Sequence, residues 1–190
     1  MNKNIIWLAS YPKSGNTWLR AILSSLINSR NGEFNFDYLK LITNFEQSFY
    51  YEFVKKLNMD DFNSLRELKT ISKYWIKAQL EFNEKNIVRI FKTHSANISF
   101  LDNHYTNSIN SKGLIYMIRD PRDVVISYAN HLNKSIDQTI NIIQSINALT
   151  YSGDSNYPGI LSTWEYHVSS WINFPVPKIV TKYEDLINNT

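Results

Sequence analysis

The chain has 190 residues, of which 43% are hydrophobic, and carries 20 Lys plus Arg against 17 Asp plus Glu. This length supports one sizeable hydrophobic core, so we expect residues 1–190 to form a single domain. A net charge of +3 without a long basic run is not typical of a nucleic-acid tail, which favours a small anionic partner. The absence of cysteine excludes disulfides, thiolate catalysis and cysteine-ligated zinc, and it suits a reducing compartment.

Apolar runs in the sequence are too short for targeting or membrane-spanning segments. The start MNKNIIWLASYPKSG contains a shorter apolar stretch than a signal peptide needs, and no uninterrupted apolar span is long enough to cross a bilayer. We therefore expect a cytoplasmic protein with neither a membrane nor a nucleic acid as a partner.

In chain order, short β-branched and aromatic runs alternate with helical patterns. Strands are predicted at 4–10 (NIIWLAS), 87–92 (IVRIFK), 113–118 (GLIYMI) and 178–183 (KIVTKY). Helices are predicted from the apolar face of Leu19, Ile22, Leu23 and Leu26, from the start signal DPRDV at 120–124, and near 64–84, 135–150 and 160–173. GDSNYPG at 153–159 predicts a loop between two helices. The alternation predicts an α/β fold with a mostly parallel central sheet and helices on both faces.

The loop PKSGNT at 12–17 lies between the first predicted strand and the first predicted helix. Such a loop directs backbone N–H groups and the positive end of the helix at one point, which favours phosphate or sulfate. Lys13 adds a full charge, and Gly15 allows close approach of the backbone. The remaining polar side chains add hydrogen-bond donors: Ser14, Asn16 and Thr17. An ordinary turn with a solvated lysine is the alternative, and the later motifs weigh against it.

A nucleotide-binding loop of the pattern G-x-x-x-x-G-K-[ST] is a rival interpretation. Pro12 stands where a glycine should precede the lysine, and Trp7 occupies the position of the first glycine. The stretch 114–120 (LIYMIRD) resembles an apolar strand that ends in a magnesium-binding Asp, but Asp120 before Pro121 is also explained as a helix cap. The two missing glycines are stronger evidence against this nucleotide-binding loop than the strand ending in Asp120 is for it.

Motifs along the chain resemble those of the cytosolic-type sulfotransferases, which use 3′-phosphoadenosine 5′-phosphosulfate (PAPS). YPKSGNTW (11–18) resembles their 5′-phosphosulfate loop, FKTHS (91–95) their Lys-Thr-His segment, and IRDPRDVVISYANH (118–131) their 3′-phosphate segment. WEYHVSSW (164–171) and KYEDL (182–186) resemble their later helix and strand. The resemblance implies a P-loop-like three-layer fold and transfer of a sulfuryl group from PAPS to a hydroxyl or amine, which leaves 3′-phosphoadenosine 5′-phosphate (PAP).

His94 is the predicted general base. A neutral imidazole accepts a proton near pH 7, and His94 follows the carboxyl end of a predicted strand, the edge where open α/β sheets bind ligands. In-line transfer also needs positive charge, for which the resemblance implies Lys13 on the leaving bridge and Lys92 on the transferring group. The other histidines are interpreted as structural: His104, His131 and His167.

The resemblance also implies the cofactor-binding residues. Arg119 and Ser127 match the ligands of the 3′-phosphate, and Trp18 is expected against the adenine with Tyr183 nearby. The complete set is Lys13, Ser14, Gly15, Asn16, Thr17, Trp18, Arg119, Ser127 and Tyr183. Because PAPS is already activated and two lysines supply charge, we expect no metal. Arg122 is interpreted as a solvated charge in the first turn of its helix.

The aromatic-rich segment from Phe34 to Trp75 corresponds to the acceptor wall of the family, which suits a small-molecule acceptor with an apolar or aromatic part. Family members continue beyond KYEDL through a basic, glycine-containing loop that closes over PAPS, whereas this chain stops at Thr190. We therefore expect a C-terminally short domain and assign no oligomeric state.

These inferences together predict a PAPS-dependent sulfotransferase catalytic domain with His94 as its base. Two alternatives stay open, a magnesium-dependent nucleotide kinase on a P-loop fold and a nucleotide-binding fragment without catalysis.

Overall fold

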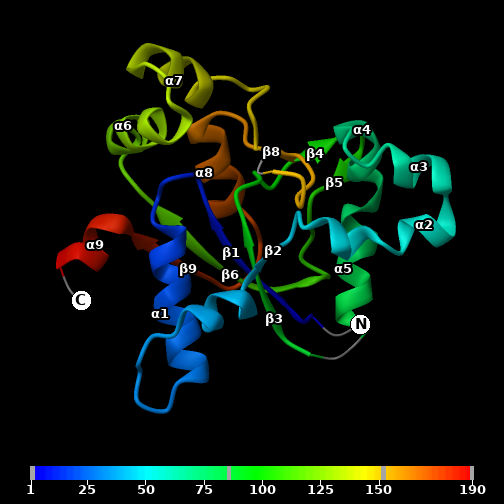
Figure 1. Ribbon diagram of the computed structural model, residues 1–190, viewed down its shortest axis with the longest axis horizontal. Coiled ribbons are helices and arrows are strands. Elements are labelled where there is room, and N and C mark those ends of the chain that lie inside the picture. Colours follow the sequence, from blue (N-terminus) through cyan, green and yellow to red (C-terminus); the bar gives the residue numbers. More distant parts are fainter. Residues whose placement is uncertain (1–2, 85–86, 151–152, 189–190) are drawn as a thin grey trace.

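A computed structural model of the chain describes residues 3–84, 87–150 and 153–188. At its centre, parallel strands form one sheet in the order β2-β3-β1-β6-β9 (Figure 1). These strands are β1 (Ile5–Ser10), β2 (Thr43–Asn44), β3 (Arg89–Thr93), β6 (Ser111–Ile118) and β9 (Lys178–Lys182). The predicted α/β fold with a mostly parallel sheet is therefore confirmed.

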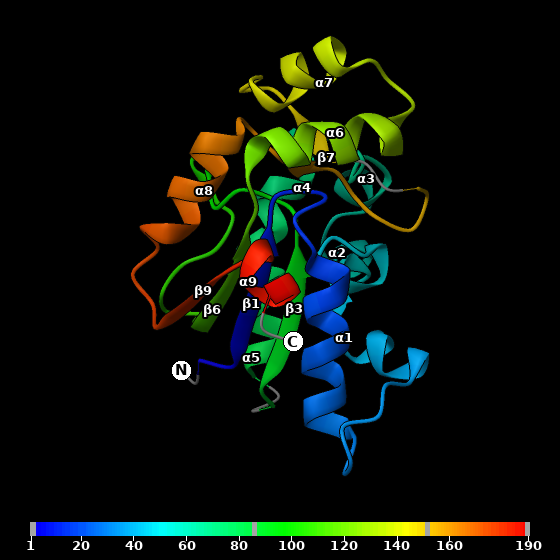
Figure 2. The same ribbon diagram turned by 90° about the vertical axis from the view of Figure 1, so that its left-hand side faces the viewer.

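Helices cover both faces of the sheet and its carboxyl edge (Figures 1 and 2). One face carries α1 (Asn16–Asn28) and α9 (Tyr183–Asn188), and the other carries α5 (Trp75–Asn83) and α8 (Trp164–Ile172). The helices α6 (Pro121–Leu132) and α7 (Ile136–Ile143) lie over the carboxyl ends of the strands. Within the described residues, no helix is long and apolar enough to span a membrane.

The central strand β1 separates two hydrophobic clusters, because successive side chains of a strand point to opposite faces. Ile5, Trp7 and Ala9 pack into the larger cluster with α5 and α8, whereas Leu8 packs with α1 on the other face. Trp7 is fully buried, and its indole N–H donates to Ser111 Oγ at 2.9 Å. This strand is apolar on both faces, which explains why its sequence is continuously hydrophobic.

Short elements between α1 and β3 escaped the sequence analysis. They are η1 (Phe36–Leu41), β2, η2 (Ser48–Tyr51), α2 (Val54–Leu57), α3 (Met59–Asn63), α4 (Leu68–Ile71) and η3 (Ser72–Tyr74). The helix expected near 64–84 is confirmed in part: the chain is helical from Leu68 to Asn83, but as the three consecutive elements α4, η3 and α5. At the break, Ser72 Oγ donates to the carbonyl of Lys69 at 3.3 Å, a local bond that competes with regular helix geometry.

Two further expectations fail in the second half of the chain. The helix expected over 135–150 ends at Ile143, and β7 (Leu149–Thr150) pairs antiparallel with β8 (Gly159–Ile160). The loop at 153–159 therefore lies between two strands, not between two helices, while residues 151–152 lie outside the described residues. A second small antiparallel pair, β4 (Ser99–Phe100) with β5 (Asn103–His104), also went unpredicted. Strands of two residues carry too little periodicity to be detected.

The predicted starts of α1 and α6 are close to those observed. Asp120 caps α6 by accepting from the backbone N–H of Arg122, with Pro121 at the first helical position. On α1, Leu19 is buried as predicted, but Leu26 is 69% exposed. The last turns of α1 thus extend beyond the residues that pack on the sheet.

Candidate active site

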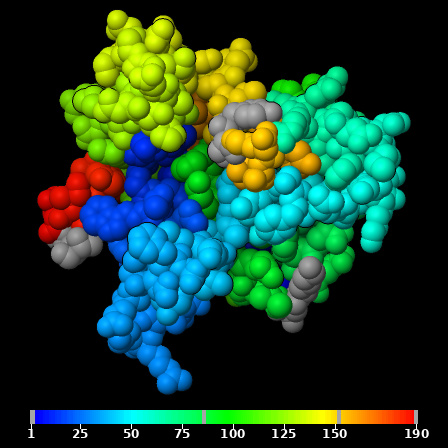
Figure 3. All heavy atoms as spheres, in the orientation of Figure 1, coloured from blue at the N-terminus to red at the C-terminus, as the bar shows by residue number. Residues whose placement is uncertain are grey.

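A cavity of about 720 Å³ opens at the carboxyl edge of the sheet, between α1 and α6 (Figure 3). Ten of the residues singled out in the sequence line it: Lys13, Gly15, Asn16, Thr17, Trp18, Lys92, His94, Arg119, Ser127 and Tyr183. Ser14 is not among the lining residues, because its side chain is buried beneath the loop. The fold thus brings distant sequence motifs to one place, where ligands of open α/β sheets bind.

The loop after β1 has the backbone geometry of an anion site. Lys13 and Gly15 both adopt positive φ, of 66° and 91°, and α1 begins at Asn16. The Asn16 amide donates to the Leu8 carbonyl at 3.3 Å and to Ser10 Oγ at 3.1 Å, which ties the helix start to the end of β1. The positive end of α1 therefore faces the cavity beside the charge of Lys13.

Buried donors around this loop fit a phosphate- or sulfate-bearing ligand. Within the described part of the chain, Ser14 Oγ and Arg119 Nε are buried and have no hydrogen-bond partner. Buried polar groups are rarely left unpaired. Because Arg119 lines the cavity and Ser14 does not, Arg119 Nε is the atom of the two that is suited to bind a ligand oxygen. The residues present therefore fit an anionic cofactor at this position.

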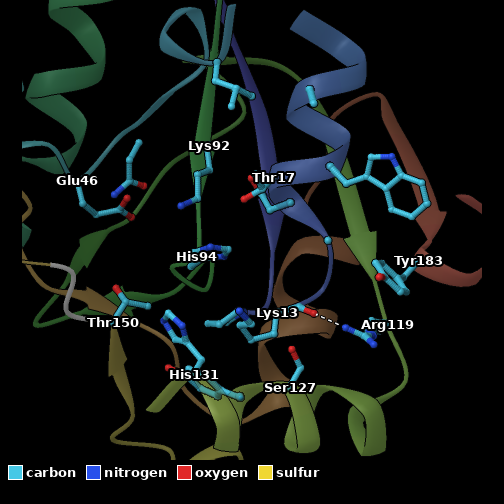
Figure 4. Close-up of a pocket in the computed structure, with 18 of the residues that line it drawn as sticks. Lys13, Thr17, Glu46, Lys92, His94, Arg119, Ser127, His131, Thr150 and Tyr183 are labelled. Carbon is cyan, nitrogen blue, oxygen red and sulfur yellow. Dashed lines mark hydrogen bonds between the residues drawn. The ribbon is translucent and has the colours of Figure 1, made fainter. Parts of the chain in front are cut away.

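Arg119, directly after β6, connects the loop to the end of the sheet. Its Nη1 donates to the Lys13 carbonyl at 2.9 Å, and its guanidinium lies 4.1 Å from the ring centroid of Tyr183. Tyr183 in turn packs edge-on against Trp18, with 5.8 Å between ring centroids. Figure 4 shows Ser127 of α6 facing the same side of the cavity as Arg119. This side combines positive charge with two aromatic faces.

His94 lies just beyond β3 and lines the same cavity. Its Nδ1 is 2.8 Å from the Ser10 carbonyl oxygen, which can only accept, so Nδ1 carries the proton and donates it. Nε2 is then the unprotonated nitrogen. Burial, reinforced by the positive charge of Lys92, holds the pKa of His94 well below 6.5. His94 is therefore a neutral base at pH 7, with Nε2 as its proton-accepting atom.

A second histidine holds the backbone of the first. His167 on α8 is fully buried and lies with Nε2 at 3.0 Å from the His94 carbonyl oxygen, to which it donates. Its Nδ1 accepts from the Tyr116 hydroxyl at 2.8 Å. Burial lowers the pKa of His167 to about 3, so its ring stays neutral. Its contacts match the structural role expected of it.

Phe34 and Phe36, from the aromatic-rich segment expected at the acceptor wall, line the cavity, whereas other lining residues were not predicted as site residues: Leu39, Asn44, Glu46, His131 and Thr150. His131, interpreted as structural, is exposed on α6 and lines the cavity. Glu46 is 3% exposed and follows β2, a strand too short to predict. A lone acidic residue in the aromatic run TNFEQSFYY was the one available signal.

In the structure, Asp120 pairs with Arg122, which is not the role of a magnesium ligand. Its carboxylate accepts from Arg122 Nε at 2.9 Å and from Arg122 Nη2 at 2.6 Å, and it does not line the cavity. Arg122 is exposed at this contact, as expected for a solvated first-turn charge. No group of three or more His, Cys, Asp or Glu that could hold a metal occurs in residues 3–84, 87–150 and 153–188.

The fold and this cavity define an α/β domain whose cavity, at the carboxyl edge of the sheet, suits a phosphate- or sulfate-bearing ligand. The chain belongs to the sulfotransferase domain family, whose match covers residues 3–190. The expected family is thereby confirmed. A comparison with curated protein sequences gives no match.

Solved structures share this fold. Retinol dehydratase in a complex with retinol and PAP aligns with a TM-score of 0.55 and 17% identity, covering 100% of this chain and 57% of that one. Retinol dehydratase with androsterone and the inactive cofactor PAP aligns with a TM-score of 0.52, 18% identity and the same coverage. The likeness establishes the P-loop-like three-layer fold, and the chain spans just over half the length of these proteins.

Gly15→Ala should destabilise the protein more than Gly32→Ala. Both glycines have positive φ, which costs a residue with a side chain about 1–2 kcal/mol. A Cβ at Gly15 would also lie 2.5 Å from Tyr183 Cδ2, whereas Gly32 has open space around it. We expect an additional loss of about 1–3 kcal/mol for Gly15→Ala, measured by urea denaturation. Equal losses in the two variants would refute the close contact with Tyr183.

His167→Gln should flatten the dependence of stability on pH. Between about 6.5, the pKa of an unfolded histidine, and about 3, the pKa of folded His167, only the unfolded chain binds the proton. The free energy of unfolding therefore falls with falling pH, by about 1.4 kcal/mol per unit for this group. Glutamine can keep both hydrogen bonds without titrating. Urea denaturation between pH 6 and 4.5 should show a slope smaller by that amount, while the exposed control His104→Gln should keep the original slope.

Proposed function

We propose that this domain transfers a sulfuryl group from PAPS to a hydroxyl or amine of a small molecule. The observation that carries this proposal is that two features occur in the same cavity. Arg119, whose Nε is buried and unpartnered, lines the cavity beside the loop with Lys13, and the neutral imidazole of His94 lines the same cavity.

In this proposal the loop binds the 5′-phosphosulfate through Lys13, Ser14, Gly15, Asn16 and Thr17. Arg119 and Ser127 bind the 3′-phosphate, Trp18 stacks on the adenine, and Tyr183 supports both through its contacts with Trp18 and Arg119. The PAP in the two retinol dehydratase structures supports this choice of cofactor. Bound PAPS supplies an activated sulfuryl group, so the chain has to supply position, charge and a base.

His94 would take the proton of the acceptor at Nε2, because Nδ1 already donates to the Ser10 carbonyl. Lys13 would stabilise charge on the leaving bridge, and Lys92 charge on the transferring group. Burial lowers the pKa of Lys92, and the negative charge of Glu46 opposes this shift. We propose no metal, since these lysines provide the positive charge.

Phe34, Phe36 and Leu39 line the cavity, which supports an acceptor with an apolar or aromatic part. Retinol and androsterone in the two related structures are also largely apolar molecules. We further propose that residues 1–190 act as one cytoplasmic domain.

Calorimetric titration with PAP and with magnesium-ATP tests the cofactor. Selective binding of PAP is expected, because Arg119 and Ser127 would recognise its 3′-phosphate. Arg119→Met should weaken PAP binding by about 10- to 100-fold, since a charge-assisted hydrogen bond contributes about 1.5–3 kcal/mol. Arg122→Met, which removes an exposed arginine outside the cavity, is the matched control and should leave binding unchanged. Preference for magnesium-ATP would instead establish the kinase alternative.

Replacing His94 with alanine should abolish transfer and spare cofactor binding. With PAPS and 2-naphthol as substrates, PAP release should fall by about 10²- to 10⁴-fold, the usual contribution of a positioned base. His104→Ala, which removes an exposed histidine, is the control. Since the pKa of His94 is held well below 6.5, the rate should not decline until the pH falls below that value. If the unmutated chain binds PAP but releases none from PAPS, the non-catalytic alternative holds.

A further inference from the structure

Glu46 is a buried carboxylate that the proposed reaction does not use. It is 3% exposed, yet it lines the cavity beside Lys92 and His94 (Figure 4). The edge strand β2 places it there, because Asn44 pairs with Lys92 and the backbone N–H of Phe45 donates to the Lys92 carbonyl at 3.0 Å. A buried charge is costly, so its partners indicate what it does.

One carboxylate oxygen holds both neighbours of His94. Oε1 of Glu46 accepts from Thr93 Oγ1 at 2.7 Å and from Ser95 Oγ at 2.8 Å. A third hydroxyl, that of Tyr105, donates to the same oxygen at 2.8 Å. Hydrogen bonds to a charged acceptor are stronger than neutral ones, so the residues before and after His94 are fixed to one point.

Close packing around Ser95 and Glu46 keeps these hydrogen bonds in place. A Cβ at Gly159 of β8 would lie 2.1 Å from Ser95 Oγ and 3.4 Å from Glu46 Oε1, so only glycine lets β8 approach the two side chains this closely. The Asn44 amide, oriented with its nitrogen toward Glu46, donates to Oε2 at 2.6 Å. Both carboxylate oxygens thus have partners, which restricts Glu46 to a single orientation.

The same carboxylate influences Lys92 without binding it directly. Among the described residues, Glu46 has no lysine or arginine nitrogen within 4.0 Å, so the Lys92 ammonium remains available to a ligand. The charged and titratable groups that act on Lys92 are Glu46 after β2, Arg20 of α1 and His94 after β3. Lys13 lines the same cavity. Glu46 is the negative member of this set.

We propose that Glu46 is a positioning residue, which fixes the His94 segment through Thr93 and Ser95 and supports the positive charge of Lys92. This inference rests on the proposed function, in which His94 and Lys92 act on the transferring group. Its test uses the ligand-free protein, so failure of the inference is distinguishable from failure of PAP to bind.

The first variant is Glu46→Gln, which keeps the side-chain shape and removes the charge. Trace acetylation with acetic anhydride as a function of pH, followed by mass spectrometry of the Lys92 peptide, gives the titration midpoint of this amine. We expect the midpoint to fall by on the order of one pH unit, since Glu46 no longer favours the charged form. The matched control Glu84→Gln, an exposed residue at the end of α5, should leave the midpoint unchanged. An unchanged midpoint in Glu46→Gln would overturn the proposal.

Thr93→Val is the second variant, and it tests whether the hydrogen bonds to Glu46 position His94 even if Glu46→Gln does not fold. It removes one hydroxyl next to His94 and retains the carboxylate. Long-range ¹H–¹⁵N spectra of the histidine rings should show a single Nδ1–H tautomer of His94 in the unmutated protein and a mixture in Thr93→Val, with the Lys92 midpoint unmoved. A single tautomer in both proteins would contradict the positioning role.

Discussion

The hydrogen bond between His94 Nδ1 and the Ser10 carbonyl joins the two strand ends on which the site is built. It forms because β1 and β3 are parallel neighbours with Ala9 opposite Thr93, so that Ser10, the last residue of β1, lies beside His94, the first residue after β3. One bond therefore does two things. It fixes the tautomer of His94. It also holds the end of β1, and with it the loop at 12–17, at a constant distance from His94.

Positive charge is concentrated around this bond. Lys13, Lys92 and Arg119 line one cavity, and the positive end of α1 points into it. Such an arrangement is unfavourable in the absence of an anion, because like charges repel and the burial of Lys92 favours its neutral form. The half-buried His94 and the fully buried His167 stay neutral and so add no further charge. The site is thus prepared for a ligand with several negative charges, whose binding stabilises the folded state.

The sequence predicted the parts of the site that depend on local geometry. The loop at 12–17 is recognisable because a strand, a helix start and its lysine are adjacent in sequence, and His94 is recognisable because it follows a strand directly. Glu46 and Thr150 are brought in by the two-residue strands β2 and β7, whose pairing depends on distant partners. The same limit applies to α4, η3 and α5, where the helical pattern is continuous and a serine hydroxyl interrupts it. Local patterns thus give the fold class and the side of the cavity formed by the loop at 12–17, while the side formed by Glu46 and Thr150 depends on tertiary contacts.

The cofactor side joins elements that are far apart in the chain. Gly15 at the start of α1 leaves room for the Tyr183 ring at the start of α9, and the Arg119 guanidinium lies over that ring while it donates to the Lys13 carbonyl. Tyr183 is positioned by β9, which pairs with β6 in the register that also brings Ile118, the residue before Arg119, opposite Lys182. The contacts of Tyr183 with the loop and with Arg119 therefore depend on the pairing of β9 with β6. A substitution that weakens this pairing should therefore displace Tyr183 from the loop without altering any residue of the loop itself.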